Sequence, residues 1–440
     1  MPLRLNCLTA MFAPGRLGGQ TLLTFGFKMW SAAASFGLSW LIARSYGAAG
    51  SGFFAIGVTT VTILSYVVLV GLDYIVVRDA AGDLREGKKD SARGVVRSAV
   101  LSVAVLGPLV AGTLWLARDW VAVEILRQPT MTAILGIMLW AIIPLALQRI
   151  ASAALRASNR IVASQVIDGP LGTTVAVTGV AAGMWFGNPS GLLLPATLYL
   201  VGISVGSFVG WMVWRSVVRD WPRATPALLA PMLIAGLPVI ASNLSNMFTE
   251  WYTTVSLGSL WSAAEVGHYR AAWQFVALAG LVQVAMDTVI GPRIAAAARV
   301  GQLDEIASVA RRSIGLVLVL GSPIFIALIV FPGPLLGIFG PEFREGATAL
   351  QILATGQLIR LASGPLGNIL LMTGQQRWIL AYAGVGMLSC IVAVALLVPE
   401  YGAEGAAWAT AIAVTLRSVG AFWVVQRRLG INLLRRRRRA

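Results

Sequence analysis

Two arginines, Arg360 and Arg417, lie near the middle of long apolar stretches of this 440-residue sequence. A charge at the centre of a membrane-spanning helix costs about 2.5–3.5 kcal/mol on insertion scales, so it is usually retained for a function or for a buried ion pair. We expect both arginines to line a water-filled interior that their charges make positive. A purely structural ion pair is the alternative for each.

Polar side chains also recur at helical spacing inside the apolar stretches. Four such stripes are Lys28, Ser31, Ser35 and Ser39; Thr59, Thr62, Tyr66 and Asp73; Asn243, Asn246, Glu250 and Thr254; and Gln357, Arg360, Gly364 and Asn368. Residues at this spacing share one face of a helix, and a face this polar avoids lipid. We expect the stripes to line a shared interior, although the serines alone could serve helix packing.

Three carboxylates are candidates for coupling to an ion. Glu250 lies within an apolar stretch and on a polar stripe, so it is the first candidate to gain and lose a proton. Asp73 and Asp287 lie nearer the ends of their stretches, where pairing with neighbouring basic loops is the alternative. The single histidine, His268, has an aromatic setting that favours a structural role.

The sequence offers little to a catalytic mechanism. One histidine and two distant cysteines, Cys7 and Cys390, exclude the common catalytic triads and zinc sites. No phosphate-binding loop of the Walker type occurs, so ATP does not drive this chain directly. We therefore predict a protein that is not an enzyme and needs neither a metal nor another cofactor.

The elements that position these residues are membrane helices. Apolar residues make up 57% of the chain and charged residues 12%, with a mean hydropathy of +0.79, which is outside the range of soluble domains. Apolar stretches of about 20 residues, each long enough to cross a bilayer, recur throughout. We predict an all-α polytopic membrane protein with twelve transmembrane helices, which start near residues 21, 51, 96, 131, 161, 192, 228, 264, 313, 346, 378 and 405.

The net charge of +16 follows from membrane topology. Most of the 34 basic residues fall in loops on one side of these helices, which the positive-inside rule assigns to the cytoplasm together with both termini. Nucleic acid is therefore not an expected partner. The arginine run at 435–439 anchors the last helix or binds anionic lipid headgroups. The first apolar run has full length, so we expect it to stay as an anchor.

The chain repeats itself. The recurring residues are Gly52, Arg78 and Pro108 and, 215 positions later, Gly267, Arg293 and Pro323. Six helices per half is an even number, so the repeat is parallel and related by an axis along the membrane normal. We predict two pseudo-symmetric six-helix bundles, residues 1–220 and 221–440, around a central cavity.

Short segments in a fixed order carry a family resemblance. They are RSYGAAGSGFFAI (44–56), GLDYIVVRD (71–79), MFTEWY (247–252), EVGHYRAA (265–272), FGPEF (339–343) and VPEYGAEGAA (398–407). Across nearly the whole chain they resemble the polysaccharide transporter family of the multidrug/oligosaccharidyl-lipid/polysaccharide exporter superfamily, the O-antigen and exopolysaccharide flippases. Glu250 falls where that family often has an acid, whereas Trp251 stands where a basic residue frequently follows it.

The resemblance implies a V-shaped pair of bundles that alternates between inward-open and outward-open states. It also implies the cargo of that family, an undecaprenyl-pyrophosphate-linked oligosaccharide, which is moved across the bacterial cytoplasmic (inner) membrane for surface polysaccharide synthesis. Membrane lipids and other polysaccharide assembly proteins are the further partners, and we expect a monomer. Arg270, Arg360 and Arg417 become candidate phosphate partners, and ion coupling would run through Glu250. The candidate substrate contacts are Arg270, Arg360, Arg417, Lys28, Gln357, Asn243 and Asn246.

Three alternatives remain. A drug/cation antiporter of the same superfamily would favour acids and aromatic rings over arginine in its interior. A membrane-embedded polysaccharide polymerase or ligase would need a sizeable outer loop with basic residues and histidines, whereas the predicted outer loops are short. A membrane scaffold without transport activity would tolerate neutralisation of Arg360 and Arg417.

Overall fold

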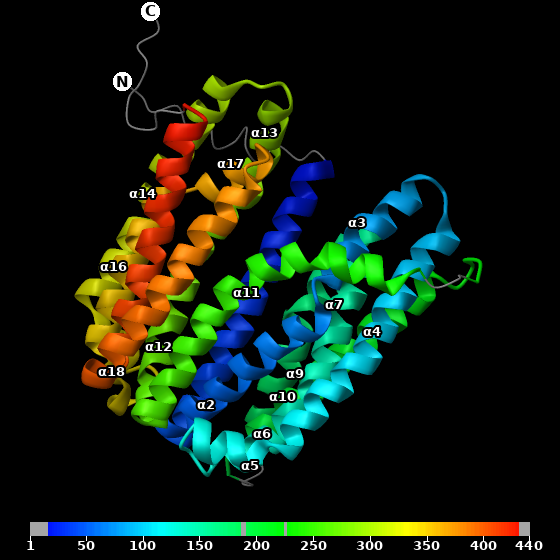
Figure 1. Ribbon diagram of the computed structural model, residues 1–440. Coiled ribbons are helices and arrows are strands. Elements are labelled where there is room, and N and C mark those ends of the chain that lie inside the picture. Colours follow the sequence, from blue (N-terminus) through cyan, green and yellow to red (C-terminus); the bar gives the residue numbers. More distant parts are fainter. Residues whose placement is uncertain (1–15, 186–190, 224–226, 431–440) are drawn as a thin grey trace, which may run out of the picture.

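The computed structural model describes residues 16–185, 191–223 and 227–430, and inside its helices the side chains of some residues, Asn243 and Asn246 among them, lie outside the description. Every regular element in these ranges is a helix (Figure 1). Seven described helices are long and apolar enough to cross a membrane, by length and composition. The prediction of an all-α, multi-pass membrane protein is therefore confirmed.

The two longest helices are each bent at one glycine. Helix α2 (Arg16–Leu69) has a left-handed φ of 66° at Gly47, and α18 (Gln376–Arg428) has a φ of 51° at Gly402. A new helix starts after each bend, and its first N–H groups have no partner within the helix. After each bend, a carboxylate distant in sequence accepts a hydrogen bond from one of these N–H groups. Glu342 accepts from Ala48 N and Glu265 accepts from Ala403 N, both at 2.9 Å. Each long helix is therefore a pair of helices joined by a capped turn.

Shorter helices fill the first half of the chain. After α2 come α3 (Leu72–Arg85), α4 (Lys89–Leu116), α5 (Arg118–Trp120), the π-helical turn η1 (Val121–Ile125), α6 (Met131–Met138), the 3-10 turn η2 (Leu139–Ala141), α7 (Ile142–Ala157), α8 (Ile161–Asp168), α9 (Pro170–Trp185) and α10 (Leu193–Val217). Helix α9 begins at Pro170, which lacks the N–H that a continuous helix would require.

The second half repeats much of this pattern. It contains α11 (Leu229–Leu260), α12 (Ala263–Ala279), α13 (Leu281–Arg299), α14 (Leu303–Val330), α15 (Pro332–Leu336), the 3-10 turn η3 (Pro341–Gly346), α16 (Ala347–Ser363) and α17 (Leu366–Met372), before α18. Helices α4 and α14 are both 28 residues long and carry Pro108 and Pro323 inside them. The internal repeat of the sequence is therefore also a repeat of helix length and of proline position.

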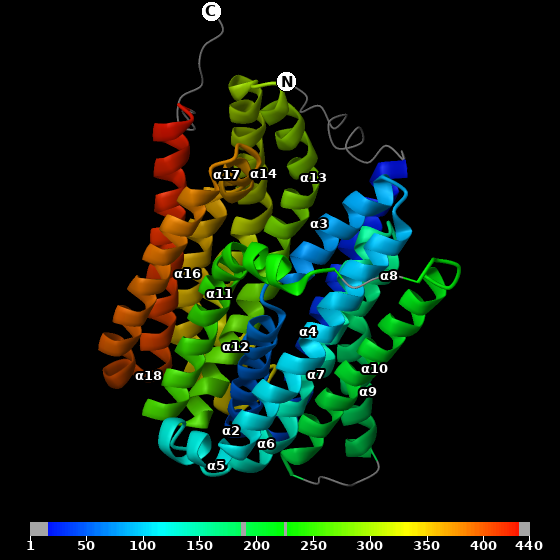
Figure 2. The ribbon, with the colours of Figure 1, turned by 45° about the vertical axis from the view of Figure 1, so that its right-hand side comes forward.

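The helices of the two halves gather on two sides. Helices α3, α4, α7, α9 and α10 lie on the right of Figure 1 and α14, α16 and α18 on the left, with α5 and α6 at the bottom. In the turned view of Figure 2, α16 and α18 lie on the left and α9 and α10 on the right. Helix α11 crosses from one side to the other. It begins beside α4, where Ser98 Oγ donates to Ala227 O at 2.7 Å, and continues beside α2 and α18. One buried apolar core runs through both halves and includes Leu135 and Leu353.

The glycines of the repeat are the points where the halves meet. A methyl group built on Gly52 of α2 would overlap the carbonyl oxygen of Ala263 in α12, and one built on Gly267 would overlap that of Ala48. The contact is reciprocal, because Ala263 and Gly267 lie 215 residues after Ala48 and Gly52. Small residues four positions apart let membrane helices approach to backbone contact. Helices α2 and α12 thus cross through equivalent surfaces, as in a two-fold dimer.

This crossing makes a prediction about stability. Gly52→Val or Gly267→Val forces side-chain atoms against a backbone carbonyl that cannot move aside, so each variant should lose at least about 1–3 kcal/mol of unfolding free energy. The melting temperature of the purified protein in detergent should be clearly lower for both variants than for the wild type.

The matched control is Gly112→Val, since a Cβ at Gly112 in α4 meets nothing within 4 Å. Equal melting of all three variants would contradict the close crossing.

Candidate functional site

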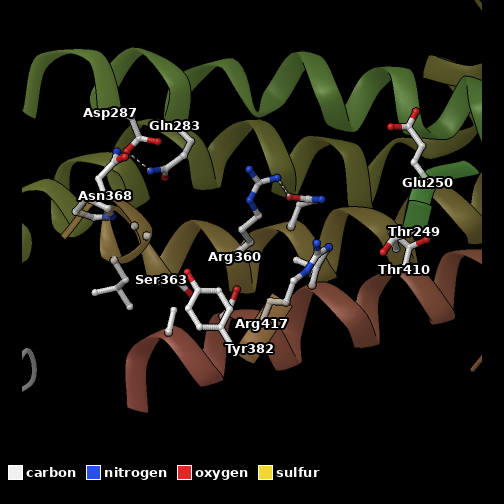
Figure 3. A pocket seen from close by; sticks show the side chains of 18 of the residues that line it. Thr249, Glu250, Gln283, Asp287, Arg360, Ser363, Asn368, Tyr382, Thr410 and Arg417 are labelled. Atoms are coloured by element: carbon white, nitrogen blue, oxygen red, sulfur yellow. Dashed lines mark hydrogen bonds between the residues drawn. The ribbon is translucent and has the colours of Figure 1, made fainter. Parts of the chain in front are cut away.

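A cavity of about 450 Å³ lies within the second half of the chain. Its walls come from α11, α12, α13, α16, α17 and α18, and Figure 3 shows it from close by. Helix α16 ends at Ser363, and Gly364 and Pro365 separate it from α17. Because this break interrupts the helix, all three residues line the cavity. We call this the second-half cavity.

Both intramembrane arginines line the second-half cavity. Arg360 comes from α16 and Arg417 from α18, and their side chains extend into the same space in Figure 3. Arg360 Nη1 donates to Gln357 Oε1 at 3.2 Å, one helical turn earlier. Gln357 is itself buried, with 8% of its surface exposed, so its oxygen is held in place for this contact. The charges that the sequence indicated in two separate spans are therefore brought together.

A glycine makes room for the side chain of Arg417. Gly386, on the first part of α18, is buried against Arg417 on the second part, and a methyl group at Gly386 would overlap Cγ of that arginine. The missing side chain therefore gives the Arg417 stem its path toward the cavity. The sequence analysis did not identify Gly386, because a glycine in an apolar span has no distinctive local pattern.

Asp287 occupies one end of the second-half cavity. Its Oδ1 accepts a hydrogen bond from Gln283 Nε2 at 3.0 Å, and Asn368 also hydrogen-bonds to the carboxylate. The charges of Arg360 and Lys28 act on it through space. Asp287 therefore faces a cavity arginine, and the pairing with a basic loop that the sequence left open is not its main interaction.

Glu250 occupies the other end of this cavity and forms an ion pair with Arg270. Arg270 Nη1 and Glu250 Oε1 are 2.5 Å apart, and the side chains of Arg270 and Glu250 are 18% and 30% exposed. The family pattern would place a basic residue directly after the acid, where this chain has Trp251. Here the basic partner comes instead from the next helix, 20 residues later.

A second cavity lies on the far side of this ion pair. It measures about 220 Å³ and is lined by residues of both halves of the chain. Ser35 and Ser39 of α2 and Tyr199 of α10 face Arg270 and Gln274 of α12 across it. We call it the junction cavity. Since Glu250 lines the second-half cavity and Arg270 lines the junction cavity, the ion pair forms the wall between them.

The junction cavity is closed toward the end of the molecule where α2 bends at Gly47. Trp40 Nε1 and Arg44 Nε both donate to Ile338 O, at 3.0 and 3.1 Å, and Ala48 N donates to Glu342. These donors are spaced four residues apart on α2, so one helical face holds the segment 338–342. Arg44 is therefore part of a hydrogen-bonded seal between the halves.

The remaining predicted residues are more scattered. Lys28 is exposed on α2, and Asn243 and Asn246 fall among the side chains outside the description. Asp73 lies in the first turn of α3, and its Oδ1 is buried without a hydrogen-bond partner among the described residues. Neither Lys28 nor Asp73 is among the residues that line the two cavities.

Arg149 contributes a further charge near the junction cavity, and no polar stripe of the sequence includes it. It lies within α7, where its guanidinium stacks on the Tyr66 ring at 3.8 Å. Its charge also acts on Tyr199, which lines the junction cavity and hydrogen-bonds to Thr62. The polar face that contains Thr62 and Tyr66 was the available signal, but nothing local linked it to Arg149.

Helices long and apolar enough to cross a membrane, two cavities with polar side chains in their lining and an ion pair between them are features of a multi-pass transporter. The chain belongs to the family described as polysaccharide biosynthesis protein, whose model matches residues 17–297. A second family model, MatE, matches residues 238–396. The resemblance predicted from the sequence is confirmed, and the matched proteins are transporters and flippases rather than enzymes.

Individual relatives agree with this assignment. The probable flippase AglR of Haloferax volcanii is 26% identical over 182 residues, which are 40% of this chain and 38% of that protein, so the chain matches well under half of its length. An inward-facing multidrug resistance MATE family transporter of the MOP superfamily superimposes with a TM-score of 0.74, at 14% identity over 93% of this chain and 98% of the other. The lipid II flippase MurJ in an inward closed conformation gives a TM-score of 0.73, at 14% identity over 92% and 87%. At this identity the two structures establish the fold.

The Glu250–Arg270 pair makes a quantitative prediction. A double-mutant cycle of Glu250→Gln and Arg270→Gln should give a coupling energy of about 1–3 kcal/mol in unfolding free energy, because the pair is largely withdrawn from water. Denaturant unfolding in detergent is the measurement.

The exposed pair Arg78–Asp79, with side chains 52% and 32% exposed, is the control. Its cycle should stay below about 0.5 kcal/mol. Equal coupling in the two cycles would show that the cavity pair has no special strength.

Proposed function

We propose that this protein is a flippase that moves undecaprenyl-pyrophosphate-linked oligosaccharide across the bacterial inner membrane for surface polysaccharide synthesis. The observation that carries the proposal is the meeting of Arg360 and Arg417 in one cavity of a chain that belongs to a polysaccharide biosynthesis family. A pyrophosphate-sugar head cannot cross hydrocarbon unaided, whereas its polyprenyl tail stays in the lipid. The protein therefore has to shelter only the head.

The second-half cavity suits such a head chemically. Glu250 is neutralised by Arg270, so Arg360 and Arg417 exceed Asp287 by one positive charge. Guanidinium groups bind phosphate oxygens through paired, charge-assisted hydrogen bonds. Hydroxyl groups of Ser363 and Tyr382 line the same cavity and can hydrogen-bond to sugars. Arg270, Gln357 and Lys28, with Asn243 and Asn246, complete our proposed substrate contacts.

The architecture supports alternating access between two bundles. Counting α2 and α18 as two spans each, and α6–α7, α8–α9, α12–α13 and α16–α17 as one each, gives twelve spans divided into residues 1–220 and 221–440. The positive-inside rule assigns both termini to the cytoplasm and the bend at Gly47 to the periplasmic side. The contacts of Trp40, Arg44 and Ala48 with residues 338–342 then close the periplasmic side in this state.

An ion gradient is the proposed energy source, with Glu250 as the coupling residue and Asp73 and Asp287 as the other candidates. Glu250 is attached to Arg270, which lies on another helix, so a change in its charge would alter a contact between α11 and α12. Membrane lipids and other polysaccharide assembly proteins are the proposed partners of a monomer that uses no cofactor.

A drug/cation antiporter is the second candidate, and one observation favours it. The MatE family model matches residues 238–396, which contain Glu250 and Arg360. A lipophilic cation would, however, meet the like charges of Arg360 and Arg417 in the second-half cavity. The flippase therefore remains the better proposal.

Deletion of the gene tests the function directly. Undecaprenyl-linked oligosaccharide should accumulate in lipid extracts while surface polysaccharide disappears, and re-expression of the wild type should reverse both. Arg360→Ala and Arg417→Ala should each fail to restore more than about a tenth of surface polysaccharide, because one lost phosphate contact of ~1.4 kcal/mol or more is a tenfold effect.

Arg219→Ala, at an exposed position of the segment between the halves, is the matched control and should complement fully. Lipid extracts without accumulated oligosaccharide, or full complementation by both cavity variants, would overturn the proposal.

Gly386→Val tests the same cavity without removing a charge. Because a side chain at Gly386 occupies the path of Arg417, this variant should match Arg417→Ala in complementation at equal protein level. Gly384→Val is the neighbouring control, since a Cβ there meets nothing within 4 Å. Equal activity of the two glycine variants would contradict the packing described for Arg417.

A further inference from the structure

The junction cavity has the lining of an anion site. Its described lining includes the hydroxyl groups of Ser35, Ser39 and Tyr199 and the amide of Gln274, with Arg270 as its one charged member, and contains no carboxylate. Hydroxyl, amide and guanidinium groups can all donate hydrogen bonds to phosphate oxygens. The remaining lining is mostly apolar, with Leu38, Ile42, Phe54 and Phe339 among its members, so the donors stand out from an otherwise apolar wall.

Each wall of the junction cavity has an arginine in it or behind it. Arg270 belongs to the second-half wall, and on the first-half wall Tyr199 has the charge of Arg149 behind it. Arg149 is fixed on the Tyr66 ring at 3.8 Å, so its charge stays close to the cavity. Once Arg270 is released from Glu250, a bound anion would therefore be attracted by both halves at once.

Arg270 already forms an ion pair with Glu250, which contacts its guanidinium from one side only. Glu250 accepts a hydrogen bond from its Nη1, while a guanidinium carries five N–H donors in a planar fork. The carboxylate approaches from the second-half cavity, and Arg270 is also part of the junction-cavity lining. The two cavities therefore share one cation, which the Glu250 carboxylate occupies in this state.

We propose that the junction cavity is a second phosphate site, in which Arg270 exchanges the Glu250 carboxylate for a phosphate group of the lipid-linked cargo. This inference rests on the proposed function, because that function supplies the phosphate. The volume of about 220 Å³ accommodates a diphosphate or a few waters, at ~30 Å³ per water, but no oligosaccharide. Only the phosphate end of the cargo enters this site, and the sugars stay outside it.

The two cavities then act in sequence. The phosphate is held first by Arg360 and Arg417 in the second-half cavity, on the Glu250 side of the ion pair. Loss of the Glu250–Arg270 contact opens the wall and exposes an unpaired guanidinium on the far side. Transfer to Arg270 brings the cargo against α2 and α10, so the second site joins the two halves through the cargo itself.

Inorganic diphosphate is the probe, and isothermal titration of the purified protein in detergent at fixed ionic strength is the measurement. Wild-type protein should bind diphosphate through Arg360 and Arg417, and Arg360→Ala/Arg417→Ala should abolish this binding. Glu250→Gln added to that double variant should restore binding at the junction cavity, at least about tenfold tighter than the double variant itself, which corresponds to ~1.4 kcal/mol. Further addition of Arg270→Gln should remove the restored binding.

Glu400→Gln, which neutralises an exposed carboxylate of α18, is the matched control and should restore nothing. Ser39→Val should weaken the restored binding without affecting the wild-type site. Each variant is checked for a monodisperse profile and a defined melting transition. Should Glu250→Gln fail that check, Glu250→Asp provides the same test with a smaller gain, because its shorter side chain lengthens the ion pair.

The outcomes separate the two claims. If wild-type protein binds diphosphate and the double variant does not, but Glu250→Gln restores nothing, the second site is wrong and the proposed function stands. If Arg360→Ala/Arg417→Ala binds diphosphate like wild type, the proposed use of those arginines is wrong, whatever Glu250→Gln does. Binding restored by Glu250→Gln that survives Arg270→Gln would also overturn the exchange at Arg270.

Discussion

A charged side chain inside hydrocarbon must reach water or an opposite charge, and the interior of this protein is arranged around that constraint. Arg360 and Arg417 extend into one cavity, and Asp287 closes one end of it. Glu250 and Arg270 neutralise each other at the opposite end. The helix break at Gly364 and Pro365 contributes to the same space. Polar groups that would be costly in lipid therefore mark where water and a polar ligand enter.

The halves of the chain are joined in two different ways, and the difference bears on movement. At the crossing of α2 and α12, the backbones touch at Gly52 and Gly267, so these helices cannot approach further. Nearer the bend at Gly47, hydrogen bonds made by Trp40, Arg44 and Glu342 join the halves, and Phe36 packs on the buried Phe339 with ring centroids 5.2 Å apart. The three hydrogen bonds themselves oppose opening only weakly, because hydrogen bonds exchanged with water contribute little net free energy.

The position of the Glu250–Arg270 pair links binding to architecture. The pair separates a cavity built by one half from a cavity built by both. Its acid belongs to α11, which begins beside the first half at Ser98 and Ala227, and its base belongs to α12, which crosses α2. A change at this pair therefore acts on the helices that connect the two sides of the molecule.

The sequence by itself determined the helical membrane class, the internal repeat, the family and the charged residues of interest, because hydropathy, helical periodicity and spacing are local properties of the chain. It indicated Arg360, Arg417 and Glu250 from their depth in apolar spans. Only the tertiary structure decided their partners: Arg270 for Glu250, Gly386 for Arg417, and Ile338 for Arg44. Arg149 on the Tyr66 ring is a further such contact. These contacts join helices whose relative rotation depends on packing along their whole length, and no single segment encodes that rotation.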